Sequence, residues 1–195
     1  IMSYNIENMH AMFFKKKLKA SELPRAKDIS NVIRSVDPHI LGIVEAANKI
    51  PAHEDFLSST GLDRLGFKIA KGTVNRSRQD LVFYYRDPFE IEIIDPDPLY
   101  YEPWVEDIDD DGIKEVCEFE RTPLEVIFRV KNSDLKIYFI LVSCKSKGVF
   151  SVSDLLQYQK LAIANRERLV AQTRKLKRRI DEIQTQDPCM PIIVM

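Results

Sequence analysis

A short apolar run, Ile40–Val44, places the strongest constraint on the fold of this chain. Asp37 and Pro38 precede the run, and its length and composition predict a strand buried in a parallel sheet. Glu45 follows directly, at a point where core packing requires no carboxylate. Because burying an unpaired carboxylate is costly, Glu45 is either a metal ligand or general base, or a solvated residue that opens a loop. The run by itself leaves both interpretations open.

The composition predicts one α/β domain. The chain has 195 residues, of which 45% are apolar and 30% are charged, enough for a sizeable core. The net charge of −1 gives no global positive field, which disfavours a sequence-reading DNA-binding protein but not an enzyme that holds one phosphate. The three cysteines lack CxxC spacing, so neither a disulfide framework nor a cysteine zinc site is expected. No apolar stretch approaches the ~20 residues of a membrane span.

The order of apolar patterns predicts a layered α/β sandwich with mixed, largely antiparallel sheets and outer helices. Helical spacing covers Leu23–Val36 and residues 153–184. Strands are expected at 1–6, 40–44, 66–70, 80–85, 91–94, 124–130, 135–142 and 191–195. The basic residues at 174–179 are interpreted as the solvated face of the long helix rather than a nucleic-acid contact. Strand-like sequence at both ends predicts an incomplete domain.

Four short motifs occur in a fixed order along the chain. They are the Asn5 motif (SYNI), the Glu45 motif (GIVE), the Arg121 motif (ERTPL) and the Ser143 motif (SCKSK). Together they resemble motifs of the endonuclease/exonuclease/phosphatase superfamily, and within it the deoxyribonuclease-like bacterial hydrolases. The resemblance implies that residues 1–195 are the N-terminal portion of one such domain, cut before its last strands.

The resemblance also implies the parts of a phosphoesterase site. Asn5 and Glu45 match the asparagine and the magnesium-binding glutamate of the family, with Mn²⁺ as an alternative ion. Such oxygen ligands suit Mg²⁺, which keeps its other positions for water and substrate phosphate. Arg121 matches an arginine near the phosphate-binding floor, where a guanidinium fork can meet two phosphate oxygens.

A further acidic residue is expected to take part in catalysis. Asp80 opens the pattern DLVFYYR and matches the acidic residue of the corresponding family strand. Arg76 and Arg78, in the turn before it, are interpreted as solvated turn residues in preference to substrate contacts.

Ser143 is the main departure from the family pattern, because the family usually has a histidine there. As a catalytic residue, serine can donate a hydrogen bond but cannot become an imidazolium. Lys145 or Lys147 could replace the lost charge, although neither occupies the same position. The remaining family motifs, glycine-aspartate-x-asparagine and aspartate-histidine, would lie beyond Met195.

These residues predict a divalent-metal-dependent hydrolase of phosphate esters, a nuclease or phosphatase/phosphodiesterase, acting by in-line attack of water. The alternative is a degenerate family member that binds a phosphate-bearing ligand without turnover. The 195-residue piece alone is expected to be inactive. The histidines, His10, His39 and His53, do not match catalytic positions and are assigned to the surface or to loops.

An acidic stretch gives a second metal hypothesis. Asp107, Asp109, Asp111 and Glu118 meet the spacing D-x-D-x-D-G-x₅-E of a calcium loop, although the preceding sequence does not predict an entering helix. A lone calcium-stabilised loop and a solvated acidic turn both remain open. The expected partner is a phosphate ester, with nucleic acid among the candidates, and the oligomeric state is left open. For the compartment, the cytoplasm is slightly favoured over secretion.

Overall fold

The computed structural model describes residues 1–72, 79–94, 102–144, 148–149 and 152–195, which form two compact units. The first unit comprises Ile1–Asp97, Arg121–Val142 and Pro191–Met195. The second comprises Pro98–Glu120 and Ser143–Met190. Each unit has its own secondary structure and its own core.

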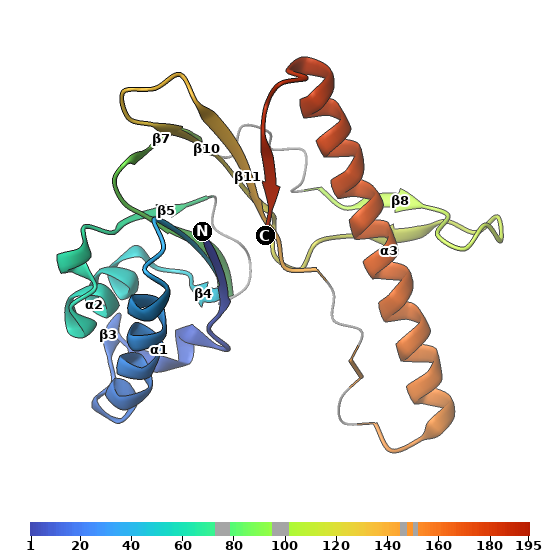
Figure 1. Cartoon of the computed structure of the whole chain (residues 1–195). Coiled ribbons are helices and arrows are strands. Elements are labelled where there is room, and N and C mark those ends of the chain that lie inside the picture. Colours follow the sequence, from blue (N-terminus) through green and yellow to red (C-terminus); the bar gives the residue numbers. More distant parts are fainter. Residues whose placement is uncertain (73–78, 95–101, 145–147, 150–151) are drawn as a thin grey trace. The chain divides into compact units, whose positions relative to one another are not determined.

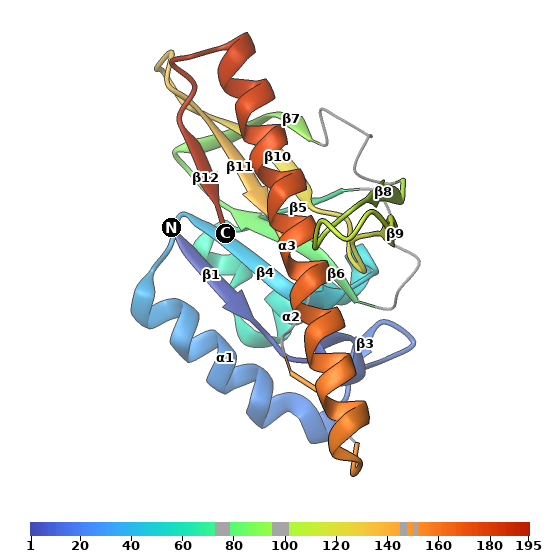
Figure 2. The ribbon, with the colours of Figure 1, turned by 90° about the vertical axis from the view of Figure 1, so that its right-hand side faces the viewer.

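The first sheet of the first unit has the strand order β1-β4-β6-β5. Its strands are β1 (Met2–Asn5), β4 (Ile40–Ala47), β6 (Gln79–Tyr85) and β5 (Lys68–Lys71). Strand β4 is parallel to β1 but antiparallel to β6 (Figure 2). The apolar run is therefore buried as predicted, in a sheet that is mixed rather than parallel.

Two helices cover one face of this sheet (Figure 1), α1 (Leu23–Val36) and α2 (Ile50–Thr60). Ile33 of α1 and Phe56 of α2 pack with Leu41 and Tyr84 of the sheet in one buried cluster. Shorter elements complete this layer: η1 (Met9–Met12), β2 (Phe13–Phe14), β3 (Lys17–Leu18), η2 (Ala20–Glu22) and η3 (Asp63–Leu65). The bounds of α1 are those that the helical spacing predicts.

A second sheet packs against the other face of the first. Its order is β12-β11-β10-β7, with β7 (Phe89–Ile94), β10 (Leu124–Val130), β11 (Lys136–Leu141) and β12 (Ile192–Val194). Phe83 of the first sheet meets Phe128 and Phe139 of the second edge-on, at ring-centroid distances of 5.7 and 5.9 Å. Gly42 allows this close approach, since a Cβ there would lie 2.8 Å from Leu141 Cδ1. The predicted layered sandwich is confirmed.

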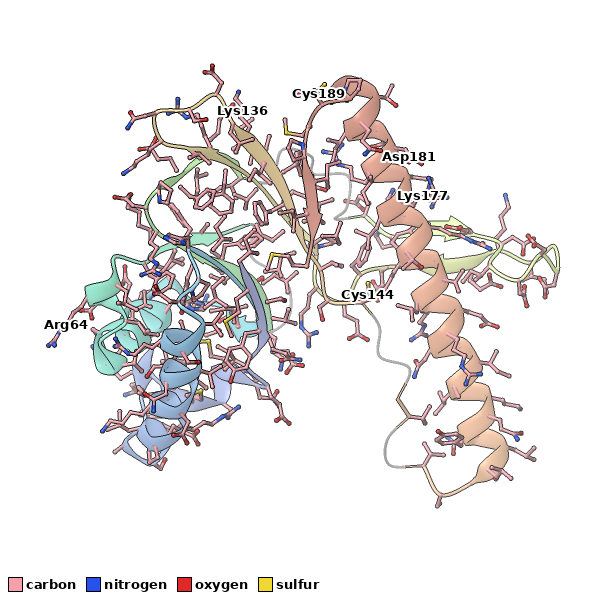
Figure 3. The ribbon with its side chains drawn as sticks, in the orientation of Figure 1. Arg64, Lys136, Cys144, Lys177, Asp181 and Cys189 are labelled. Carbon is pink, nitrogen blue, oxygen red and sulfur yellow. The ribbon has the colours of Figure 1, made fainter. Side chains whose placement is uncertain are left out.

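The second unit contains β8 (Trp104–Glu106), β9 (Glu115–Cys117) and the long helix α3 (Leu155–Gln186). The basic face of α3 is ion-paired: Arg178 lies 2.9 Å from Glu106, and Lys177 lies 2.7 Å from Asp181 (Figure 3). Such pairs are typical of a solvated helix face. Within the described part of the chain, no helix has the length and apolar character to cross a membrane.

His53 lies in the core, so its assignment to the surface or a loop is wrong. It belongs to α2 and is fully buried. Its Nε2 donates to the carbonyl of Ala47 at 2.7 Å, and its Nδ1 therefore accepts from the Tyr84 hydroxyl, also at 2.7 Å. The apolar positions of α2 alone could not reveal that this ring holds the end of β4. Burial lowers the pKa of His53 to about 4.

We expect His53 to make stability depend on pH. Because its pKa is about 4 in the folded state and near 6.5 when unfolded, the unfolded chain binds the proton first as pH falls. Roughly 3 kcal/mol of stability should be present above pH 6.5 and be lost progressively between about pH 6.5 and pH 4. Urea unfolding of the wild type and His53→Gln at several pH values measures this contribution. His39→Gln, at an exposed loop position, should keep the wild-type pH dependence; an unchanged dependence in His53→Gln would refute the assignment.

Candidate active site

Glu45 lies inside β4 rather than after it. The strand was predicted to end at Val44, but it continues to Ala47 through a register shift between Ile43 and Ala46. At this irregularity Glu45 has a φ of 60°, a left-handed conformation that costs a non-glycine residue roughly 1 kcal/mol. Bulges of this kind re-aim a side chain and are common beside active sites. The hydrophobic pattern predicts where the run of core residues ends. It cannot predict a bulge through which the strand continues.

Three donors surround the Glu45 carboxylate. The Asn5 amide donates to Oε1 at 3.2 Å, while the Asn8 backbone N–H and the Gln79 amide donate to Oε2 at 3.0 and 3.1 Å. Burial by itself raises the pKa of Glu45. The hydrogen bonds from Asn8, Asn5 and Gln79, together with the charge of Arg121, outweigh burial and leave this pKa below its usual value. Glu45 is therefore a carboxylate at neutral pH.

The parallel pairing of β1 with β4 brings Asn5 to Glu45. Asn5 is in register with Val44, and the carboxyl ends of both strands meet at the same edge of the sheet. Asn5 Oδ1 also accepts the Glu7 N–H at 2.9 Å, which fixes the turn that carries Asn8 back to Glu45. The structure thus brings together the asparagine and the glutamate that the sequence singled out.

Gln79 contacts both Glu45 and Arg121, although the sequence did not single it out. It begins β6, opposite Ala47 of β4. Its amide nitrogen donates to Glu45 and to Asn8 Oδ1, the latter at 2.6 Å, and its Oε1 accepts from the Arg121 guanidinium. Because β6 was predicted to begin one residue later, Gln79 was assigned to the turn. One side-chain amide therefore joins the carboxylate to the arginine.

Asp80 is buried beside this group. It forms an ion pair with Lys71 of β5, and both side chains are almost fully buried. Adjacent strand residues point to opposite faces of the sheet. Gln79 therefore contacts Glu45, whereas Asp80 contacts Lys71. The structure gives Asp80 a buried cationic neighbour, and its catalytic role stays a prediction.

The other expected residues do not add to the described site. Ser143 belongs to the second unit, and its role also stays a prediction. The turn residues Arg76 and Arg78 and the lysines Lys145 and Lys147 lie outside the described residues.

The donor set fits a hard divalent cation. A carboxylate has about four acceptor positions, of which the described hydrogen bonds to Glu45 use three. The remaining acceptor position is on Oε1, which accepts a hydrogen bond from Asn5 alone among the described residues. Mg²⁺ binds through one or two carboxylates and retains water elsewhere, so Glu45 is suitable as a partial ligand. Asn5 faces Oε1 with its amide nitrogen, and its role as a metal ligand stays a prediction.

The acidic loop connects β8 and β9 as a hairpin, so no helix enters it. Asp107, Asp109 and Asp111 each offer an oxygen, and these oxygens lie within 4.8 Å of one another. Glu118, the fourth predicted ligand, is not in this group among the residues that the structure describes. Asp107 Oδ2 accepts the Gly112 N–H at 3.0 Å, while its buried Oδ1 has no hydrogen-bond partner among the described residues.

Comparison with known proteins rests on the fold, because no family model and no curated protein matches the sequence. Truncated TDP2 from Caenorhabditis elegans is similar with a TM-score of 0.50 and 17% identity over 97% of this chain. The human Nocturnin catalytic domain has a TM-score of 0.49 and 13% identity over 98% of this chain. A Bacteroides thetaiotaomicron endonuclease/exonuclease/phosphatase family protein has a TM-score of 0.46 and 12% identity over 98% of this chain.

The chain spans 58% of the TDP2 structure, 61% of the Nocturnin domain and 60% of the bacterial protein. The fold assignment rests on the TDP2 structure, the one of these three whose TM-score reaches 0.5. Together with the sandwich of two mixed sheets and its outer helices, it agrees with the expectation from the sequence motifs. This chain shares the DNase I-like fold of the TDP2 structure.

Proposed function

We propose that this chain belongs to a divalent-metal-dependent phosphoester hydrolase and supplies its Glu45 metal ligand and its Arg121 phosphate contact. The observation that carries the proposal is the hydrogen-bonded chain from Glu45 through Gln79 to Arg121. It places a fixed carboxylate and a guanidinium on either side of one amide. A ligand for a cation and a cationic side chain can together stabilise the charge that develops on phosphoryl oxygens during transfer.

Each residue has a distinct part in this mechanism. Glu45 and Asn5 would hold Mg²⁺ or Mn²⁺, because the lowered pKa of Glu45 keeps its charge at neutral pH. The metal would supply charge stabilisation at a phosphoryl oxygen and an activated water for in-line attack. Arg121 would bind the phosphate oxygens, and Gln79 would orient the guanidinium before substrate arrives.

The alternative is a protein that binds a phosphate-bearing ligand without hydrolysing it. Ser143 supports this alternative, because serine cannot supply the positive charge of an imidazolium. Turnover distinguishes the two proposals, since both require Arg121 and only hydrolysis requires an activated water.

Glu45→Gln should abolish hydrolysis by the full-length protein. The substitution keeps the shape but removes the charge that holds the metal, so we expect Mg²⁺ affinity and the hydrolysis rate each to fall at least about 100-fold. Calorimetric Mg²⁺ titration and assays on plasmid DNA and bis(p-nitrophenyl) phosphate measure both. Glu54→Gln makes the same chemical change at an exposed position of α2 and should behave as wild type. Absence of turnover on both substrates with Mg²⁺ and with Mn²⁺ would favour the non-catalytic alternative.

Gln79→Met should raise the pKa of Glu45 and slow hydrolysis about tenfold. The methionine has a similar length but loses the donor to Glu45 and the acceptor for Arg121, so the carboxylate loses a stabilising hydrogen bond. Carbon-detected NMR titration of the Glu45 carboxyl measures its pKa directly and does not require an active enzyme. Gln157→Met, on the exposed start of α3, is the matched control. A Glu45 titration identical to wild type would show that Gln79 does not position the site.

We also propose that the β8–β9 loop binds Ca²⁺ through Asp107, Asp109 and Asp111. The proposal is supported by their converging oxygens and by the left-handed φ of Gly112, 85°, which closes the turn. The buried, unpartnered Oδ1 of Asp107 is the kind of oxygen that a cation would satisfy.

Ca²⁺ should therefore raise the unfolding temperature. At ten times its dissociation constant it should add about 1.4 kcal/mol of stability, since it binds the folded loop alone. Thermal unfolding in Ca²⁺ and in EGTA measures the shift. Asp109→Asn should remove it, whereas Asp110→Asn, at an exposed even position of the same loop, should retain it. Equal unfolding temperatures in Ca²⁺ and EGTA would leave the loop as a solvated acidic turn.

A further inference from the structure

The bulge in β4 decides which way Glu45 points. Before the bulge the strand alternates regularly: Leu41 and Ile43 belong to the core under the helices, and Val44 packs against the core between the two sheets. An unbroken alternation would turn Glu45 toward the helices, into the same core as Ile43. Ala46 occupies that core instead. The bulge therefore keeps the carboxylate out of the core.

The bulge adds one residue to β4. Ile43 pairs with Val82 of β6, and Ala46 pairs with Asp80, so two residues of β4 lie opposite one residue of β6. Glu45 accommodates the extra length with its left-handed φ of 60°. Because this conformation is unfavourable for a residue with a side chain, the bulge persists only where the surrounding contacts hold the strand.

His53 makes such a contact on the far side of the bulge. Only Asn48 and Lys49 separate the end of β4 from the start of α2. His53, the fourth residue of α2, reaches back across this short connection and donates from Nε2 to the Ala47 carbonyl at 2.7 Å. The bond fixes the start of α2 to the strand two residues beyond Glu45.

Tyr84 fixes the direction of this bond. The Ala47 carbonyl can only accept, so the neutral ring of His53 carries its proton on Nε2 and accepts at Nδ1 from the Tyr84 hydroxyl at 2.7 Å. Burial raises the pKa of Tyr84 and lowers that of His53 to about 4, so neither group is charged at neutral pH. A buried ring with both nitrogens bonded is restricted to one orientation and holds the strand rigidly.

We propose that His53 is a positioning residue for Glu45, and that its bond to the Ala47 carbonyl holds the bulge that brings the carboxylate to its three donors. In this role His53 contacts neither metal nor substrate and acts only through the backbone of β4. Loss of the bond lets the strand relax toward regular alternation, which moves the carboxylate away from the Asn8 N–H. The inference rests on the proposed function for the part that Glu45 plays, but the position of the carboxylate can be measured without turnover.

The test compares two amides at position 53 of the full-length protein. In His53→Gln the amide nitrogen can occupy the position of Nε2 and donate to Ala47. In His53→Asn the shorter amide reaches only the position of Nδ1, so this donor is lost. The NMR signal of the Asn8 backbone N–H, which donates to Glu45, reports whether the carboxylate is in place. We expect this proton signal to move upfield in His53→Asn and to keep its wild-type position in His53→Gln.

Metal binding and kinetics give a second measurement. His53→Asn should weaken Mg²⁺ binding about tenfold and lower kcat by a similar factor, as expected for a residue that orients a metal ligand. KM should change by less than about twofold, because His53 does not hold Arg121. Ile33→Ala is the control: it removes buried volume from the core under the helices but no hydrogen bond. This control should lower the unfolding temperature and leave the Asn8 signal, Mg²⁺ affinity and kcat as in wild type.

Equal Asn8 signals and Mg²⁺ affinities in wild type and His53→Asn would overturn the proposal, and so would their loss in His53→Gln or Ile33→Ala. Thermal unfolding verifies that each variant is folded. If His53→Asn does not fold, the ring-nitrogen NMR signals of the wild type decide, because a proton on Nδ1 would refute the bond to Ala47. A protein that needs His53 for the Asn8 bond but hydrolyses neither substrate keeps the positioning role and refutes the hydrolase.

Discussion

The parallel pairing of β1 with β4 is the contact on which the candidate site depends. The two strands are distant in sequence, yet their register sets Asn5 beside Val44 and returns the following turn to Glu45. Without this pairing the carboxylate would have neither its Asn5 nor its Asn8 donor. Both faces of β4 are buried, Leu41 and Ile43 against the helices and Ile40 against the second sheet. A one-residue slip would exchange these two sets of core side chains, so the packing holds the register.

Glu45 shows how a partly buried carboxylate can remain charged. Desolvation is the largest single influence on its pKa and acts against ionisation. Three oriented hydrogen bonds and the Arg121 charge together exceed that influence. Without these partners, desolvation alone would raise the pKa of Glu45 above its usual value. Gln79 matters because its amide both donates to the carboxylate and accepts from the arginine, which a carboxylate or an ammonium group could not do.

The sequence predicted the parts of this arrangement that depend on local periodicity. The helix Leu23–Val36 and the hairpin β10–β11 follow from patterns that a few neighbouring residues display. The bulge at Glu45, the contact of Gln79 and the burial of His53 depend on strands that meet only in three dimensions. Asn5, Glu45 and Arg121 were identified from the order of the sequence motifs. The structure places all three in one hydrogen-bonded group, which the amino-acid composition could not predict. Gln79 was not predicted as a site residue because the ends of strands are the feature that sequence patterns locate least accurately.

Backbone geometry gives an independent reason to place function in this region. Among the described non-glycine residues with positive φ, Asn8 and Glu45 belong to the candidate site. The others lie in turns, loops or at a helix end: Lys15, Lys16, Asp37, Asp110 and Asn132. Glycine would relieve each position at little conformational cost to the folded chain, and asparagine would be tolerated in the turn. At Glu45, glycine would also remove the carboxylate. The chain keeps a charged side chain at this strained position, as expected when geometry at a site is maintained at the expense of stability.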